Sequence, residues 1–347
     1  MAEGNKNFER PEIRIVGSVS EQEKSEFHEK LQGRFGEGHL DQIPPDKLKI
    51  FEENEYEKEP YETDSIHLAN GIINGIRTKH GLPAFDVPPR NIHIVPKDIY
   101  KGIDDKENRA GVTAGAAQFI AINKDVFDGN KVVEADTILH EMVHLKGYMA
   151  YEVGEGGVNA PYRSGLKIFP TFKKEAKQGG YKLFSGLGEA VVAEITKRWS
   201  KKILADNPGL KKEKEWMDSA AAKDKMKEIT AKRNYPEDEI EFAGEDGVHW
   251  LHTYYFQRRV LYFILEKIAE DKQISEDSVW EDFEKAHFTG NILGIAKSVK
   301  ASFGEDAFNF LGTMDASETS ANMVLDYLKK KRRKIEARKH RETDKPI

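Results

Sequence analysis

The chain has 347 residues, of which 38% are hydrophobic and 33% are charged, and its formal net charge at pH 7 is −6. This length suits one large domain or two of ordinary size, and the negative charge argues against a protein whose whole surface binds polyanions. The chain has no cysteine, which excludes disulfides, thiolate nucleophiles and Cys-ligated zinc, so any metal must be held by His, Asp or Glu.

The N-terminal region, residues 1–60, is acidic, with nine Lys/Arg against fifteen Asp/Glu. It lacks the apolar stretch of a secretory signal, and no run in the chain approaches the roughly 18 apolar residues of a membrane span. We therefore expect a cytoplasmic protein with no membrane contact. Within this region, alternation predicts a strand over 12–16, and an amphipathic pattern predicts a helix over 18–35. We interpret residues 1–60 as an acidic appendage and a candidate regulatory segment.

The pattern becomes denser after residue 61. Apolar spacing predicts a helix over 62–80, and a short apolar run predicts a strand over 91–95. The stretch 110–123 is nearly bare of side chains in its first half and strand-like in its second, and small residues in a strand often mark close approach of another backbone. Residues 128–130, Asp-Gly-Asn, predict a turn and a helix cap before a helix over 131–148.

The C-terminal half of the chain is predicted to be mainly helical. A helix is expected over 188–200, and helical patterns continue over 204–233, 249–270 and 278–328. Residues 329–347 form a basic tail with ten Lys/Arg against three acids. We interpret this tail as a solvated helix end and do not expect nucleic-acid binding, because it carries no aromatic residue for base stacking.

The strongest chemical signal is the segment His140-Glu141-Met142-Val143-His144. On a helix, positions i and i+4 lie on one face, so His140 and His144 can reach the same metal ion. Glu141 is turned away by about 100° and can lie beside the ion, where a general base belongs. The segment therefore predicts a zinc site with one Zn²⁺ per chain.

This motif resembles that of the zincin metallopeptidases. The resemblance implies an edge strand before the active-site helix, which pairs with an extended substrate, and residues 116–123 are the match. The metzincin branch would require a third histidine where this chain has Ala150. The chain is thus more similar to the gluzincin branch, whose third zinc ligand is a carboxylate on a second helix.

The gluzincin resemblance assigns the third ligand to Glu189, within the Gly-Glu-Ala segment that begins at Gly188. Glu194 is rotated by about 140° from Glu189 on a regular helix, so only one of the two can face the metal. Gly188 is expected to let its backbone approach the active-site helix. The family commonly places an acidic residue four positions after the ligand, where this chain has Ala193, and Asp136 is the alternative residue to orient His140. The other carboxylates that we weigh as third ligand are Glu152 and Glu155.

An oxyanion donor is suggested by Tyr255, which precedes Arg259 by one turn in a segment similar to the Tyr-x-x-x-Arg of compact gluzincins. An aromatic stripe of this kind is equally typical of a helix core. The alternative donors are His249, His252 and Tyr181.

Together these observations predict an α+β, zincin-like fold that is mainly helical, with a small mixed sheet packed on the active-site helix. The expected domains are the appendage 1–60, a catalytic domain over 61–328 and the tail 329–347. The expected activity is zinc-dependent hydrolysis of peptide or protein substrates, with Glu141 as general base. The alternative is a latent or non-proteolytic zinc-binding protein of the same fold that acts as a binding module. Cleavage preference and oligomeric state do not follow from the sequence.

Overall fold

The computed structural model describes residues 13–17, 19–34, 45–103, 109–115, 117–154, 159–169, 182–233, 235–244 and 248–343. Most of these residues are helical, and the strands form small sheets with parallel and antiparallel pairs, which confirms the α+β class. None of the described helices is both long and apolar enough to cross a membrane. The chain divides into two compact units: Met1–Lys146, Ala150–Ala160 and Ile195–His252 form the first, and Gly147–Met149, Pro161–Glu194 and Thr253–Ile347 form the second.

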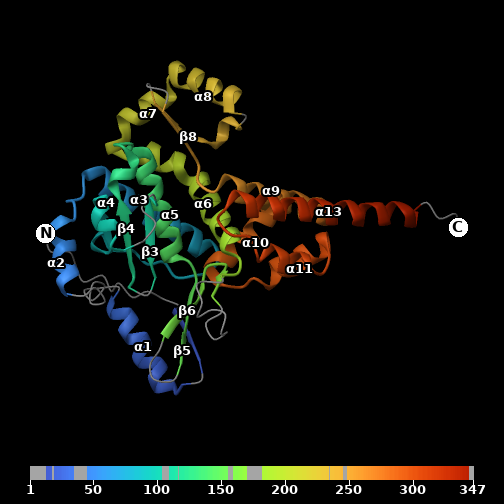
Figure 1. Ribbon diagram of the computed structural model, residues 1–347, viewed down its shortest axis with the longest axis horizontal. Coiled ribbons are helices and arrows are strands. Elements are labelled where there is room, and N and C mark those ends of the chain that lie inside the picture. The colour runs from blue at the N-terminus through green and yellow to red at the C-terminus, as the bar shows by residue number, and fades with distance from the viewer. Residues whose placement is uncertain are drawn as a thin grey trace. The chain divides into compact units, whose positions relative to one another are not determined.

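The first unit contains most of the strands (Figure 1). Its strands are β1 (Ile13–Val16), β2 (Ile92–Val95), β3 (Gly111–Ala114), β4 (Phe119–Asn123), β5 (Met149–Val153, of which Met149 belongs to the second unit), β8 (Ile240–Ala243) and β9 (His249–Leu251). Its helices are α1 (Glu21–Arg34), α2 (Pro45–Asn54), α3 (Pro60–Lys79), α4 (Lys97–Tyr100), α5 (Lys131–Lys146), the second half of α6 (Ser185–Asp206), α7 (Lys211–Asp218) and α8 (Ala220–Arg233).

The sheet that supports α5 has the strand order β2-β4-β3. Strand β4 is central, because it pairs in parallel with β2 and antiparallel with β3. The expectation that residues 116–123 form a substrate-binding edge is therefore wrong, since the backbone of β4 is already paired on both sides. Within the described residues the two edge strands of this sheet are β2 and β3, and β3 is the first half of the stretch singled out in the sequence.

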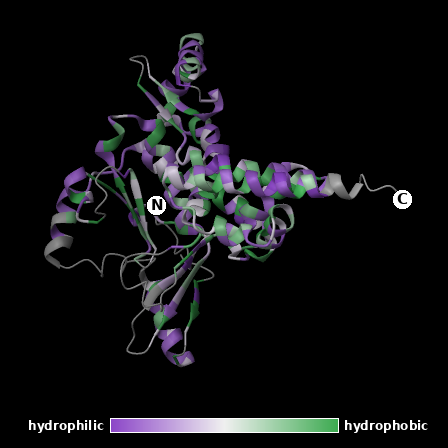
Figure 2. Ribbon diagram, turned by 45° about the vertical axis from the view of Figure 1, so that its right-hand side comes forward, coloured by the Kyte–Doolittle hydropathy of each residue, from purple (hydrophilic) through white to green (hydrophobic). Residues whose placement is uncertain are grey.

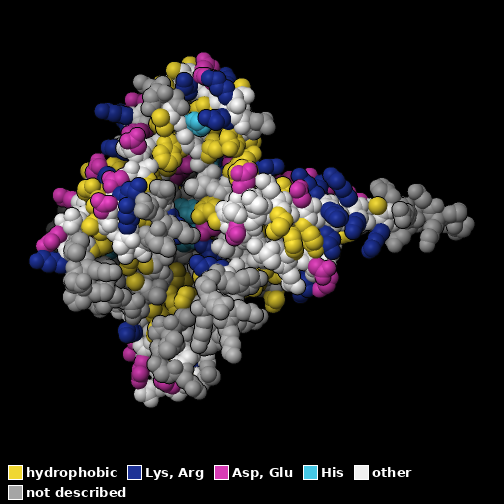
Figure 3. All heavy atoms as spheres, viewed as in Figure 1, with side chains coloured by type: hydrophobic (Ala, Val, Ile, Leu, Met, Phe, Trp, Pro, Cys, Tyr) yellow, Lys and Arg dark blue, Asp and Glu magenta, His cyan; other side chains and the backbone are white. Residues whose placement is uncertain are grey.

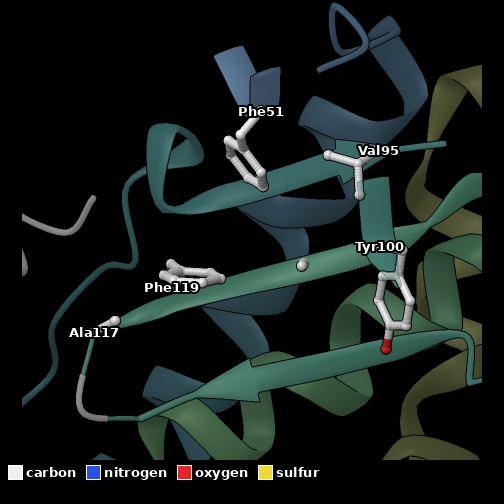
Figure 4. Close-up of a cluster of buried hydrophobic side chains, with 6 residues drawn as sticks. Phe51, Val95, Tyr100, Ala117 and Phe119 are labelled. Atoms are coloured by element: carbon white, nitrogen blue, oxygen red, sulfur yellow. The ribbon is translucent and has the colours of Figure 1, made fainter. Parts of the chain in front are cut away.

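The two faces of β4 are buried in different ways. Phe119 and Ala121 on one face belong to an apolar cluster with Phe51 of α2, Val95 of β2 and Tyr100 of α4 (Figure 4). Because side chains alternate along a strand, Ile120 and Ile122 point to the opposite face, and both are completely buried. Helix α5 contacts both β3 and β4. All five residues of β4 are buried, as expected of a central strand covered on both faces.

Helix α5 begins and ends at well-defined contacts. Its N-terminus is capped by Asn130, whose side-chain oxygen accepts hydrogen bonds from the backbone N–H groups of Val132 and Val133, each at 3.2 Å. The predicted turn and cap are thus confirmed. At the C-terminus, the guanidinium of Arg77 on α3 donates to the carbonyl of Lys146 at 2.7 Å. Helix α3, which matches the helix expected over 62–80, packs along α5.

The N-terminal region contributes β1, α1 and α2 to the first unit. Leu31 of α1 is completely buried, and the ring of Phe27 contacts that of Tyr151 edge-on, with 5.8 Å between centroids. Strand β1 lies beside β5. Residues 1–12 lie outside the described residues, and the regulatory role of the segment stays a prediction.

A two-stranded hairpin follows α8. Strands β8 and β9 are antiparallel, and Ile240 packs with Ile229 of α8. The indole N–H of Trp216 on α7 donates to the carbonyl of Ala243 at 2.6 Å. The helix expected over 249–270 is therefore wrong at its start, because His249, Trp250 and Leu251 form β9 and the helix begins only at Tyr255.

The second unit is mainly helical (Figure 1). Its elements are β6 (Asn159–Ser164, which begins in the first unit), β7 (Lys167–Ile168), the first half of α6, α9 (Tyr255–Lys272), α10 (Glu276–Thr289), α11 (Leu293–Phe303), α12 (Ala307–Leu311) and α13 (Glu318–Thr343). Strands β6 and β7 are antiparallel. Helix α9 contacts α10, α11 and α13, and its buried face carries Val260, Leu261 and Ile264.

The basic tail continues helix α13 as far as Thr343, so the prediction of a helix end is confirmed. Hydrophobic and hydrophilic residues alternate along this helix (Figure 2), and Lys and Arg side chains cover much of its surface (Figure 3). Arg332 departs from the expected solvated face. Its side chain is buried, and it pairs with Asp271 at the end of α9 and with Glu336 on its own helix.

Candidate metal centre

The two histidines of the motif share one face of α5, as predicted. The imidazole rings of His140 and His144 are 4.9 Å apart between centroids, with an angle of 76° between their planes. His140, Glu141 and His144 are 7%, 8% and 8% exposed, so all three side chains are buried but keep a small solvent-accessible surface. A helix that places two imidazoles side by side at low exposure provides two nitrogen ligands in the spacing that zinc sites use.

Glu141 points toward the edge strand β3. The hydroxyl of Thr113 lies 2.7 Å from Glu141 Oε2 and 2.9 Å from the Glu141 backbone oxygen, and it can donate its proton to either. At Gly111, a Cβ atom would come within 2.8 Å of Glu141 Cγ and 3.1 Å of Thr137 Cγ2. A glycine in β3 is therefore what leaves room for the Glu141 side chain. The small residues of this stretch predict the close approach of another backbone, whereas the group that approaches Gly111 is the Glu141 side chain.

The third predicted ligand is Glu189 on α6. One ligand atom from each of His140, His144 and Glu189 lies within 4.8 Å of the other two. Glu189 also forms an ion pair through Oε1 with Lys167 Nζ at 2.7 Å. The expected approach of Gly188 to the active-site helix stays a prediction. A Cβ at Gly188 would meet Lys167 Cγ at 2.9 Å, so the glycine makes room for this lysine.

Glu194 has a different set of partners from Glu189. It is buried, and its Oε2 accepts a hydrogen bond from the hydroxyl of Tyr262 on α9 at 2.5 Å. Arg258 in turn donates to the Tyr262 oxygen at 3.0 Å. Neither Glu194 nor Glu152, which lies half-buried in β5, belongs to a ligand group within the described residues. Glu155 lies outside the described residues.

Tyr255, the predicted oxyanion donor, is the first residue of α9. Its ring contacts Phe256 edge-on at 5.3 Å, and the guanidinium of Arg259 lies 5.7 Å from its centroid. The expected pairing of Tyr255 with Arg259 along the helix is present. Tyr255 belongs to the second unit, and its role at the metal centre stays a prediction. The alternative donor Tyr181 lies outside the described residues, and His249 is half-buried in β9.

Sequence reasoning missed a second group of ligand-type side chains. Asp136, one turn before His140, lies with Glu241 of β8 and with His252, and one ligand atom of each is within 4.8 Å of the others. The sequence suggests Asp136 only as a residue that orients His140, and His252 only as an oxyanion donor. Burial raises the pKa of the Asp136 carboxyl, and a hydrogen bond with Glu241 opposes that shift. The sequence separation of more than 100 residues explains why no local pattern shows the group.

The donor set of the first group fits zinc. Two imidazole nitrogens and one carboxylate oxygen form a donor set that catalytic zinc sites use, with a further position open to water or substrate. Comparison of the chain with protein-family models, curated proteins and solved structures gives no match. What the site does must therefore be argued from its own residues.

Proposed function

We propose that this protein is a zinc-dependent peptidase of the gluzincin type, with His140, His144 and Glu189 as the metal ligands and Glu141 as the general base. The observation that carries the proposal is the position of Glu141. Its carboxylate lies on the helix that carries both histidines, and Thr113 of the edge strand β3 orients it. A helix whose histidines served only packing would have no need for a glycine that clears space for the carboxylate beside them.

The chemistry divides between the metal and the chain. Zinc held by these ligands supplies a Lewis acid that activates water and polarises the peptide carbonyl. Glu141 accepts the proton of the attacking water and delivers it to the nitrogen of the leaving amine, so that the C–N bond breaks as a neutral amine departs. The hydroxyl of Thr113 holds the carboxylate in one rotamer before the reaction. This pre-organisation limits the reorganisation needed during proton transfer.

The sheet offers a way to hold the substrate. Strand β3 pairs with β4 on one side, and its other edge is unpaired within the described residues. An extended peptide that adds to this edge gains backbone hydrogen bonds and lies beside Glu141, which β3 already contacts. The proposed substrate is therefore an extended segment of a peptide or protein. Helical segments would have to unfold before they could bind.

The test is a comparison of the wild-type protein with the Glu141→Gln variant. Zinc is measured by elemental analysis, and hydrolysis with a mixed peptide library. We expect about one zinc per chain in both proteins and a loss of about 10²–10⁴-fold in turnover in the variant, because only the general base is removed. Glu134→Gln, which changes another buried carboxylate of α5, is the matched control and keeps its turnover.

Two outcomes would contradict the proposal. A folded protein without bound zinc after supplementation would exclude the metal site. Substantial turnover in Glu141→Gln would exclude Glu141 as the base. A wild-type protein that binds zinc and cleaves no peptide would instead favour the non-proteolytic alternative.

A further inference from the structure

The second ligand group of the first unit lies one helical turn from the proposed zinc site. Asp136 comes from α5, Glu241 from β8 and His252 from the residue after β9. Helix α5 contacts β8, and the β8–β9 pairing brings Glu241 and His252 to the same end of the hairpin. All three residues belong to the first unit. The group is thus built by three elements that are fixed relative to one another.

The backbone of the hairpin is shaped around this group. The pairing register between β8 and β9 shifts between Ile240 and Phe242, at the position of Glu241. Such an irregularity re-aims the side chain of the extra residue. The backbone N–H of His252 donates to the carbonyl of Glu239 at 3.0 Å, which fixes the start of the following segment.

The carboxylates of this group are buried more deeply than a pair of acids usually is. Asp136 is 4% exposed and Glu241 is 9% exposed. Oδ2 of Asp136 is fully buried and accepts no hydrogen bond from any described residue. The His252 ring nitrogen Nδ1 lies 3.9 Å from Glu241 Oε2, a distance at which the two form an ion pair when the ring is protonated. Burial of such carboxylates costs folding free energy unless a positive charge compensates them.

We propose that Asp136, Glu241 and His252 form a second metal site, separate from the histidine pair, which binds a first-row divalent cation such as Mn²⁺. The donors are two carboxylate oxygens and one imidazole nitrogen. Carboxylates suit Mn²⁺, whereas an imidazole ligand disfavours Mg²⁺ and Ca²⁺. At metal–ligand distances of about 2.1 Å, two ligand atoms on opposite sides of an ion are about 4.2 Å apart, so the group needs only a small contraction to bind.

The site would act by joining α5 to the hairpin. A dication neutralises both carboxylates at once and fills the coordination that Asp136 Oδ2 leaves open. Binding to the folded state alone stabilises that state by mass action, so added Mn²⁺ should raise the unfolding temperature. This inference does not depend on peptidase activity.

The experiment uses the full-length chain with His140→Ala and His144→Ala, which removes the first site. The purified protein is titrated with MnCl₂, and free Mn²⁺ is followed by its electron paramagnetic resonance signal. We expect one bound Mn²⁺ per chain. Adding Asp136→Asn and Glu241→Gln should abolish this binding, whereas adding Glu134→Gln should leave it unchanged.

The rival arrangement is a hydrogen-bonded triad that shares a proton and needs no metal. A folded parent protein that binds no Mn²⁺, or equal binding after Asp136→Asn and Glu241→Gln, would overturn the metal site. If the double substitution prevents folding, as judged by circular dichroism, His252→Gln is tested in its place. It should weaken Mn²⁺ binding by more than the factor of about 10–100 that an outer-shell partner contributes, and a smaller effect overturns the proposal.

Discussion

Helices α5 and α13 both bury ionisable side chains, but they do so in opposite ways. On α13, Arg332 directs its nitrogens at carboxylates of two helices: Nη1 at Asp271, Nε at Glu336 at 2.8 Å, and Nη2 at Glu270 at 3.7 Å. On α5, by contrast, two of the buried groups lie beside a side chain of their own type. His140 lies beside His144, and Asp136 lies beside Glu241.

This difference separates charged side chains that stabilise the fold from side chains that are arranged to bind a ligand. The charge of Arg332 is neutralised within the chain, so its loss should cost folding free energy. A convergence of imidazoles or carboxylates stabilises little by itself, so its loss should change binding and leave the fold intact. The predictions below test this division, starting with the largest expected effect.

The strongest test compares the two glutamates of α6. Glu189 shares a ligand group with the histidines, whereas Glu194 accepts a hydrogen bond from Tyr262. We expect Glu189→Ala to weaken zinc binding by orders of magnitude. Glu194→Ala should cost at most the factor of about 10–100 that is typical of an outer-shell partner. The zinc dissociation constants are measured by competition with a chromophoric chelator. If Glu194→Ala lost the metal and Glu189→Ala kept it, the assignment of the third ligand would be reversed.

A second test moves the base without removing it. In Gly111→Ala, the new methyl group would lie 2.8 Å from Glu141 Cγ, so the glutamate side chain must shift. A displacement of about 1 Å at a reacting group can cost roughly 10²-fold, and we expect a loss of kcat of that order with zinc content unchanged. Gly75→Ala is the control, because nothing lies within 4 Å of its added Cβ. Unchanged kcat in Gly111→Ala would show that Glu141 tolerates the shift and that its position is not critical.

Local patterns in the sequence were sufficient for the core of this site. The i, i+4 spacing of His140 and His144 and the cap at Asn130 are properties of one helix, and both are present in the structure. The edge strand was misplaced because strand order depends on which segments pair, and no local pattern shows that β2 joins β4 in parallel. The Asp136 group was missed for the same reason, since α5 and the hairpin meet only in the folded chain.

The third test concerns helix α13 and its buried, charge-paired Arg332. Arg332→Ala removes the cation that pairs with Asp271 and Glu336 and leaves those carboxylates without it. We expect a loss of about 2 kcal/mol in the free energy of unfolding, the scale of a charged hydrogen bond. The neighbouring residue Arg333 is exposed, and Arg333→Ala should change stability by no more than about 0.5 kcal/mol. Urea denaturation of both variants gives the two values, and equal values would show that the Arg332 pairs contribute nothing.

The smallest predicted effect concerns the carboxylate of Glu55 in the first unit. Its charge is paired within the chain, as the charge of Arg332 is on α13. Glu55 accepts a hydrogen bond from the buried His93 at 2.9 Å and an ion pair from Lys58 at 3.1 Å. Burial raises the pKa of the Glu55 carboxyl, but the bonds and charges of His93 and Lys58 outweigh it and lower the pKa below the ordinary value of 4.5. A lowered pKa in the folded state stabilises the protein above the unfolded value and loses that effect as the pH falls through the folded value.

Glu55→Gln should therefore cost on the order of 1 kcal/mol at pH 7, and the difference from the wild-type protein should shrink as the pH is lowered below about 4.5. Urea denaturation between pH 3 and pH 7 measures this difference. Glu52→Gln, at an exposed position of α2, is the matched control. A difference that stayed constant with pH would mean that Glu55 contributes by packing and not by charge. Zinc binding should be the same in both variants, because neither Glu55 nor Glu52 belongs to the candidate ligand group of His140, His144 and Glu189.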